Sequence, residues 1–307
     1  MTYMERVLAL RNRAVAPAVC YVEFYLHFYR YFYVRGLPYS PERYGEAFYY
    51  ACERVTPVIE DGELIVGRVI GGLNAEMTQE WNGELGAFAR ATAARAGGGQ
   101  DSHMAIDYPL LLSVGVTGVI EKIDAYAAQN TDDRAQMFYR NARQCLLGVL
   151  RLSERYAELA ECMAQRSPDE ARAAELKEIA RICRAVPAKP ASTIYEAVQA
   201  THFISFCVSF NPMRLCPQQF QLGHPDRYLY SYYQSDVAAG RIDRERAQLL
   251  IDCLAIQINH RVPAGLSSGY MLGGRDESGA VVANEITEMG LRAIDEVRLV
   301  YPAVGLC

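Results

Sequence analysis

The residues of this sequence that could do chemistry are its cysteines and histidines, which serve as nucleophiles, general bases or metal ligands. The chain has nine cysteines and five histidines. Cys253 and His260 are seven residues apart, a spacing that places both on one face of a helix. Two ligands do not complete a metal site, so we interpret this pair as core packing. No nucleophile elbow, HExxH helix, nucleotide-binding glycine loop or calcium-binding loop is present.

The spacing of the cysteines and the distribution of charge exclude several classes of protein. The cysteine count is odd and no CxxC pair occurs, which indicates reduced thiols in the cytoplasm rather than a disulfide framework. The N-terminus lacks the basic and apolar regions of a signal peptide. The apolar stretch 19–34 contains Glu23, His27 and Arg30 and is too short to span a bilayer, so we expect no membrane partner. The net charge of -5, with acids and bases interspersed, argues against nucleic acid.

The elements that must position these residues are mainly helical. Residues 63–67 and 270–274 are short apolar runs that predict strands, or in the first case a turn onto the core. Between residues 71 and 99 the glycine- and alanine-rich sequence predicts a loop. No alternation of strands with helices indicates a doubly wound sheet. Apolar spacing, caps and breakers predict helices over 4–34 (as one or two helices), 40–55, 107–127, 132–166, 167–184, 192–207, 226–236, 243–259 and 284–297.

Five runs of sequence follow one another in an order that resembles a known family. The most specific are residues 187–199, Pro-Ala-Lys-Pro-Ala-Ser-Thr-Ile-Tyr-Glu-Ala-Val-Gln, and residues 223–236, Gly-His-Pro-Asp-Arg-Tyr-Leu-Tyr-Ser-Tyr-Tyr-Gln-Ser-Asp. Residues 272–287 combine Leu-Gly-Gly-Arg-Asp-Glu-Ser-Gly with Asn-Glu-Ile-Thr. Weaker matches are 61–67, Asp-Gly-Glu-Leu-Ile-Val-Gly, and 102–118, which begins Ser-His-Met-Ala-Ile-Asp-Tyr. Together they resemble the N-terminal part of glycyl radical enzymes of the pyruvate formate-lyase type.

The resemblance implies an α/β fold, the ten-stranded barrel of that family. This chain would supply a mainly helical N-terminal portion with a few short strands of an incomplete barrel. We expect one continuous unit over residues 1–307. Residues 1–130 would form a helical outer layer with a glycine-rich loop near 71–99, and residues 131–307 would form helices and the first barrel strands.

The resemblance also implies radical chemistry on a small-molecule substrate. In the family, a separate activating enzyme uses S-adenosylmethionine and an iron–sulfur cluster to install a radical on a glycine near the C-terminus. The radical passes to a cysteine whose thiyl takes hydrogen from the substrate, and in the dehydratase and lyase branches a glutamate two residues later acts as a base. The implied activity is that of an anaerobic, cytoplasmic lyase or dehydratase that binds no cofactor directly.

Neither radical element occurs in this sequence. It contains no Cys-x-Glu pair and no segment like Arg-Val-x-Gly-Tyr, so we assign no catalytic residue, Cys307 included. We therefore expect a truncated form that is inactive alone. The alternatives are a non-catalytic paralogue that acts as a binding or assembly subunit, one half of a split enzyme, and an unrelated helical protein with chance matches. An incomplete barrel leaves strand edges uncovered, so we also expect a homo-oligomer.

The resemblance implies four candidate substrate-binding residues and no metal ligand. His103 matches a histidine that contacts substrate hydroxyls in diol dehydratases of the family. Gln221 stands where those enzymes have serine, and His224 stands where the family has arginine; both departures leave the identity of the substrate open. Asp226 belongs to the same run, although an aspartate at a helix start also fits a structural cap.

Overall fold

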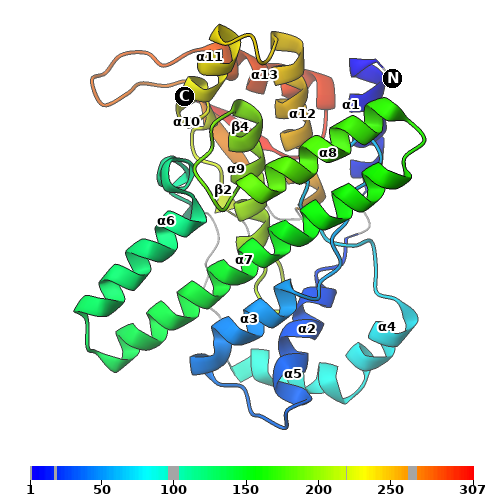
Figure 1. Ribbon diagram of the computed structural model, residues 1–307, viewed down its shortest axis with the longest axis vertical. Helices are drawn as coiled ribbons and strands as arrows, with labels where there is room; N and C mark the ends of the chain where they lie inside the picture. The colour runs from blue at the N-terminus through cyan, green and yellow to red at the C-terminus, as the bar shows by residue number, and fades with distance from the viewer. Residues whose placement is uncertain (1, 17–18, 96–103, 219, 262–267) are drawn as a thin grey trace.

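The computed structural model describes residues 2–16, 19–95, 104–218, 220–261 and 268–307 (Figure 1). The helices are α1 Tyr3–Ala14, α2 Val22–Tyr33, α3 Tyr44–Cys52 after the 3-10 turn η1 Pro41–Arg43, α4 Ala75–Asn82, α5 Glu84–Arg95, α6 Tyr108–Gln129, α7 Asp133–Arg166, α8 Glu170–Ala185, α9 Ile194–Val208, α10 Pro225–Tyr228, α11 Tyr230–Ala238, α12 Arg244–Arg261 and α13 Glu285–Val297. The strands are β1 Met104–Ala105, β2 Phe220–Gln221, β3 Gly269–Leu272 and β4 Ala303–Leu306.

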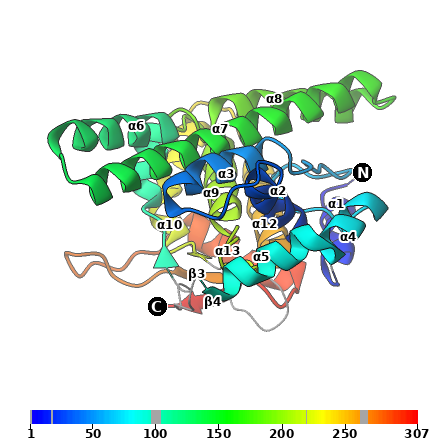
Figure 2. The ribbon, with the colours of Figure 1, turned by 90° about the horizontal axis from the view of Figure 1, so that it is seen from below.

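Helices α6, α7 and α8 form a layer along one side of the molecule (Figure 2). The predicted helix over 132–166 is confirmed as α7, which starts where the Asp132 side chain accepts a hydrogen bond from the Ala135 N–H. Its buried face includes Val149, Leu152 and Tyr156, and this face packs over α9. Among the described residues, none of the helices combines the length and the apolar character that crossing a bilayer requires.

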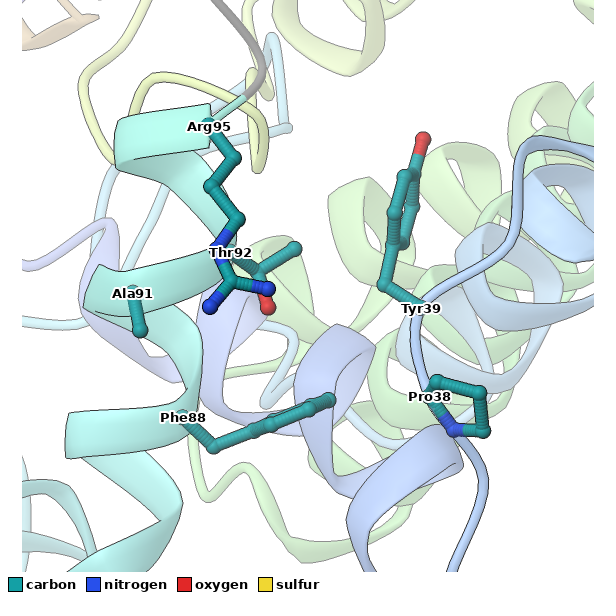
Figure 3. Close-up of a pocket in the computed structure, with 6 residues that line it drawn as sticks. All are labelled: Pro38, Tyr39, Phe88, Ala91, Thr92 and Arg95. Atoms are coloured by element: carbon teal, nitrogen blue, oxygen red, sulfur yellow. The ribbon is translucent and has the colours of Figure 1, made fainter.

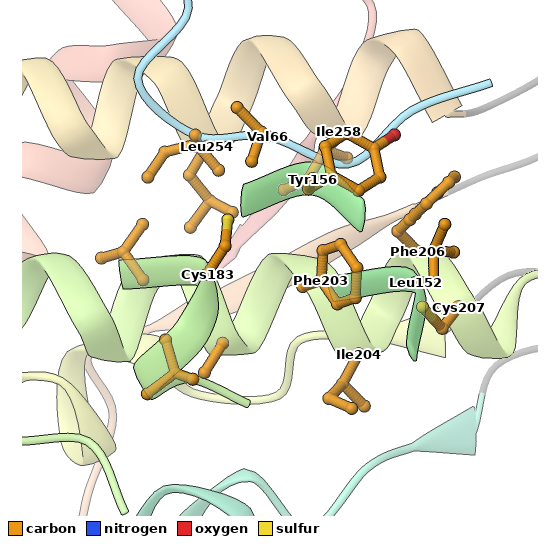
Figure 4. Close-up of a cluster of buried hydrophobic side chains, with 14 of the residues drawn as sticks. Val66, Leu152, Tyr156, Cys183, Phe203, Ile204, Phe206, Cys207, Leu254 and Ile258 are labelled. Carbon is orange, nitrogen blue, oxygen red and sulfur yellow. The ribbon is translucent and has the colours of Figure 1, made fainter. Parts of the chain in front are cut away.

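Helix α9 lies at the centre of the core. Nearly every residue from Ile194 to Cys207 is buried, as expected of a helix that is covered on all sides. Figure 4 shows Phe203 and Phe206 of α9 close to Tyr156 of α7, with Ile258 of α12 beyond them. The Phe203 and Tyr156 rings meet edge to face at 5.5 Å.

A buried irregular segment, residues 64–68, passes between α9 and α12 (Figure 4). For residues 63–67 the sequence predicted either a strand or a turn onto the core, and the structure has no strand there. Side chains of the surrounding helices hydrogen-bond the backbone of this segment instead. The Gln199 carboxamide accepts from the Val66 N–H at 2.9 Å and donates to the Val66 carbonyl at 2.7 Å. Gln257 donates to the Ile65 carbonyl at 2.7 Å.

The same arrangement continues at both ends of this segment. Tyr195 donates its hydroxyl hydrogen to the Leu64 carbonyl at 2.6 Å. Tyr156 donates to the Arg68 carbonyl at 2.9 Å and accepts from the Arg68 N–H at 3.1 Å. Burying backbone groups without hydrogen-bond partners is costly, so segment 64–68 can lie in the core only because these side chains bond to its backbone.

The four strands all run in the same direction. β1 pairs with β2 in parallel, and β3 pairs with β4 in parallel. Two backbone hydrogen bonds link the pairs, from the Leu222 N–H to the Gly269 carbonyl at 3.0 Å and from the Met271 N–H to the Gly223 carbonyl at 2.8 Å. The described strands thus form part of a parallel barrel wall, which confirms the expected incomplete barrel. The parallel neighbour of β3 argues against chance matches.

The prediction of a loop over residues 71–99 is wrong for most of that stretch. Helix α4 begins where the Asn74 side chain accepts a hydrogen bond from the Met77 N–H. Helix α5 is rich in alanine, which favours helices, so its alanines indicate a helix rather than a flexible segment. Residues 97–99, the three consecutive glycines, lie outside the described residues.

The N-terminal helix α1 is anchored by a cluster of acidic groups. The Tyr3 hydroxyl hydrogen-bonds to Asp252 of α12 and to Glu296 of α13. Gln248 donates a further hydrogen bond to Asp252 at 2.9 Å. Burial, together with the nearby Glu296 carboxylate, raises the pKa of Asp252 to about 7.

We predict that replacing Gln199 with leucine destabilises the protein, because the Val66 N–H and carbonyl are then buried without partners. The free energy of unfolding, measured by urea denaturation, should fall by about 3 kcal/mol. The control is Gln165→Leu at an exposed position of α7, which should change this free energy by less than about 0.5 kcal/mol. Equal effects of the two substitutions would contradict the assigned role.

We predict a pH-dependent contribution from Asp252. Its pKa in the folded state lies above the ordinary value, so its stabilisation is complete at acid pH and is lost as the pH rises through about 7. Asp252→Asn keeps hydrogen-bonding groups without the charge. Relative to the wild type, this variant should gain at least about 1 kcal/mol in free energy of unfolding between about pH 5.5 and pH 8.5. Parallel stability curves for the two proteins would refute this.

Candidate functional site

A cleft lies at the carboxyl ends of β1 and β2. Because the two strands are parallel, the residues that follow them meet at the same edge, where α/β proteins commonly bind ligands. The cavity has a volume of about 360 Å³, which suits a small molecule. It is lined by Ile106, Tyr108, Pro109, Leu222, Gly223, His224, Arg227 and Tyr228.

Two stacked tyrosines form the aromatic wall of the cleft. The Tyr108 and Tyr228 rings are 5.3 Å apart and nearly parallel. Tyr228 is fixed by its hydroxyl, which donates to the Leu222 carbonyl at 2.9 Å. Tyr108 opens α6, and the Asp107 side chain caps that helix by accepting from the Leu110 N–H. Tyr228 is therefore held by its hydroxyl group, and Tyr108 by its place in the capped first turn of α6.

The first turns of α6 are aimed at the cleft by a kink at Gly115. Its φ of 66° lies in the left-handed region, and an added Cβ would lie 2.4 Å from the Ala188 carbonyl oxygen, so glycine is required there. The kink frees two N–H groups of α6. Val116 donates to the Pro187 carbonyl at 2.8 Å, and Thr117 donates to the Ala188 carbonyl at 3.0 Å. The run 187–199 thus begins by fixing the helix that carries Tyr108.

His224 and Arg227 are the polar groups of the cleft. Burial and the neighbouring Arg227 guanidinium lower the pKa of His224, so its imidazole is neutral at pH 7 and can both donate and accept hydrogen bonds. Arg227 donates to the carbonyls of Gly273 and Arg275 at 3.2 and 3.0 Å. It therefore joins α10 to the turn after β3.

Asp226 lies behind the cleft wall and is fully buried. Its carboxylate accepts hydrogen bonds from the Gly273 N–H at 2.6 Å and from the Thr287 hydroxyl at 2.9 Å. Its backbone carbonyl accepts from the Asn284 side chain at 2.8 Å. One residue thus ties the run 223–236 to the run 272–287. The helix-cap interpretation was wrong, because His224 occupies the N-cap of α10.

Of the other two candidate residues, Gln221 is absent from the described lining of the cleft, and the structure does not describe His103. Gln221 ends β2, and its carboxamide oxygen accepts from the Gly269 N–H at 3.0 Å, so it helps to join β2 to β3. His103 immediately precedes β1 and lies outside the described residues. The structure therefore brings His224 to the cleft and Gln221 to the adjacent strand. The substrate-binding roles of all four residues stay predictions.

Three residues of the cleft were missed from the sequence. Tyr108, Arg227 and Tyr228 line it, and all three belong to the family-like runs. The signal that could have found them is their position just after a strand that has a parallel neighbour. That neighbour is distant in sequence, so the rule becomes usable only once the pairing is known. Among the described residues, no cluster of three or more His, Cys, Asp or Glu could hold a metal ion.

We predict that Asp226→Ala uncouples α10 from β3 and α13. The substitution leaves the Gly273 N–H buried without an acceptor, so the free energy of unfolding should fall by about 3 kcal/mol. Hydrogen exchange of residues 269–276, followed by mass spectrometry, should accelerate. Thr287→Val removes one of the two hydrogen bonds to the carboxylate and also the bond that the Thr287 hydroxyl accepts from the Asn284 N–H, and it should cost about 1 to 2 kcal/mol. Unchanged hydrogen exchange of residues 269–276 in Asp226→Ala would contradict the role assigned to the bond with Gly273.

Comparison with known proteins gives consistent matches. A family model described as pyruvate formate lyase-like matches residues 69–306. Trans-4-hydroxy-L-proline dehydratase of Clostridioides difficile is 32% identical over 166 residues, which cover 50% of this chain and 21% of that protein. Isethionate sulfite-lyase of Oleidesulfovibrio alaskensis is 31% identical over 167 residues, which cover 50% of this chain and 20% of that protein.

A solved structure shows the same fold over nearly the whole chain. The glycerol-bound form of the B12-independent glycerol dehydratase from Clostridium butyricum superposes with a TM-score of 0.85 at 21% identity. The superposition covers 98% of this chain and 47% of that chain. The chain therefore spans about half the length of that solved structure (47%), and its alignments cover about a fifth of the curated relatives (21% and 20%).

Proposed function

The chain belongs to the pyruvate formate lyase-like family, and from this premise we propose that its 307 residues form the substrate-facing N-terminal part of a glycyl radical dehydratase or lyase. Several of the matched relatives are dehydratases or lyases by name. The observation that carries the proposal is the cleft at the carboxyl ends of parallel strands, with His224 and Arg227 in its lining.

The chemistry of the cleft supports a small, polar substrate. Neutral His224 can exchange hydrogen bonds with a hydroxyl group, and the Arg227 guanidinium favours an anionic group. Tyr108 and Tyr228 supply an apolar wall that excludes water from one side of the substrate. Of the two departures from the family pattern, His224 lines this cleft and Gln221 lies on the adjacent strand β2, and we propose that together they set the substrate preference. His103 and Asp226 complete the proposed set of substrate-binding residues. We propose that His103 contacts the substrate and that Asp226 holds the wall of the cleft in place.

The radical step itself belongs to residues that this sequence does not contain. A glycyl radical, installed by an activating enzyme with S-adenosylmethionine and an iron–sulfur cluster, supplies hydrogen abstraction in the family. These 307 residues hold no Cys-x-Glu pair and no glycyl radical motif. We propose that they bind and orient a substrate and that they form no radical by themselves. An anaerobic cytoplasm is part of this proposal, and the nine cysteines without a disulfide support a reducing compartment.

A second candidate function is that of an assembly subunit or one half of a split enzyme. Among the described strands, β1 pairs only with β2, and β4 pairs only with β3. Each therefore presents an edge that another polypeptide can extend by strand pairing. A partner that carries the missing motifs would restore activity in a split enzyme, whereas an assembly subunit would bind its partner without adding a radical.

We predict that the 307-residue polypeptide gives no glycyl radical signal. It should be incubated anaerobically with a glycyl radical activating enzyme, reductant and S-adenosylmethionine, and examined by electron paramagnetic resonance. No doublet should appear, because no glycine lies in the required motif. A complete relative activated in parallel is the control and should show the doublet. A doublet from this polypeptide alone would sink the proposal.

A further inference from the structure

A second cavity lies far in the fold from the strand ends, between α5 and the chain that follows α2. Its volume is about 330 Å³, and its lining is mainly apolar. Four of the six lining residues, at positions 88, 91, 92 and 95, share one face of α5, and the other two form the opposite wall. Figure 3 shows the six residues, which are Pro38, Tyr39, Phe88, Ala91, Thr92 and Arg95. We call it the α5 cavity.

The aromatic walls of the α5 cavity are fixed from behind. The Phe88 ring meets the Tyr29 ring edge to face at 6.0 Å, and the Tyr29 hydroxyl donates to the Pro212 carbonyl at 2.8 Å. The Tyr39 ring meets the Phe32 ring edge to face at 5.5 Å. Such walls need no rearrangement before they accept an apolar ligand, which lowers the cost of binding.

Two polar groups of the α5 cavity lie side by side on its α5 wall (Figure 3). Arg95 folds back along α5 so that its guanidinium lies beside Thr92, and Tyr39 faces them from the other wall (Figure 3). Within the described part of the chain, neither the Arg95 guanidinium nor the Thr92 hydroxyl has a hydrogen-bond or ion-pair partner. By contrast, nearby Arg30 pairs with Glu80. Among the described residues, the lining of the cavity thus has one positive charge, that of Arg95, and no ion-pair partner for it.

We propose that the α5 cavity binds a small arylalkyl carboxylate, with its ring on Phe88 and its carboxylate at Arg95 and Thr92. Guanidinium and carboxylate match as a two-pronged hydrogen-bonded pair. The lining has one cation, which suits a monoanion better than a phosphate dianion. Thr92 lies one turn beyond Phe88, a rise of about 6 Å, so a two-carbon linker between ring and carboxylate fits. This site is independent of the strand-end cleft and of any radical chemistry.

The test is calorimetric titration of the 307-residue protein with 3-phenylpropanoate. We expect saturable binding with a Kd of about 1 mM or tighter, as is usual for a ligand of this size. Two other ligands separate the contributions. Uncharged 3-phenylpropanamide should bind at least about tenfold more weakly because it lacks the charge, and butanoate should do the same because it lacks the ring.

Two variants locate the site. Arg95→Gln should weaken 3-phenylpropanoate at least about tenfold while leaving 3-phenylpropanamide unchanged. Ala91→Phe fills the α5 cavity and should abolish binding of both. The matched controls are Arg140→Gln on α7 and Ala128→Phe on α6, both at exposed positions, which should leave the affinity unchanged.

Thermal unfolding checks that each variant folds, since residues 91 and 95 are exposed on α5 and should change the melting temperature little. Wild-type affinity in Arg95→Gln or in Ala91→Phe would overturn the proposal, because the ligand would then bind elsewhere. Absence of saturable binding to the wild type up to about 20 mM would overturn it as well.

Discussion

The fold depends on the burial of an irregular segment that has no strand neighbours among the described residues. Residues 64–68 run through the core between α9 and α12, where each backbone N–H and carbonyl needs a partner. The helices provide those partners through long polar side chains, among which Gln199 mimics a strand by both accepting and donating. Polar residues of the otherwise apolar, buried helix α9 are thus explained by the backbone groups that they hydrogen-bond. The register between α9, α12 and this segment is fixed by those hydrogen bonds, and the rest of the core packs around it.

At the strand ends, neighbouring residues likewise have different roles. Asp226 accepts hydrogen bonds from β3 and α13, whereas His224, two residues earlier, faces the cleft. The residue that builds the wall and the residue that meets a ligand are neighbours in one short run. This explains why the run is recognisable although one of its usual residues is changed: the structural aspartate is kept, and the position that faces the cleft differs.

Much of the fold could be predicted from the sequence, and much less of the site. Long amphipathic helices such as α7 follow from apolar spacing alone, and the short apolar run 270–274 predicted the strand that the structure has at residues 269–272. The helices in 75–95 were missed because alanine and glycine were taken together as loop formers, although only glycine disfavours a helix. The lining of the cleft could not be predicted, since Tyr108 and Arg227 meet only when β1 and β2 pair across more than a hundred residues.

The long separation in sequence between β1 and β2 affects the order in which parts of the protein fold. Met104 of β1 pairs with Phe220, and Gly269 of β3 pairs with Ala303, so every parallel pairing waits for a helical crossover to be completed. Pairings between distant residues are slow to form because the chain between them must first be ordered. During synthesis, β1 remains unpaired while α6, α7, α8 and α9 emerge and pack. Helices α6 to α9 therefore emerge before β2, and the two strand ends that form the cleft can meet only after this helical crossover is complete.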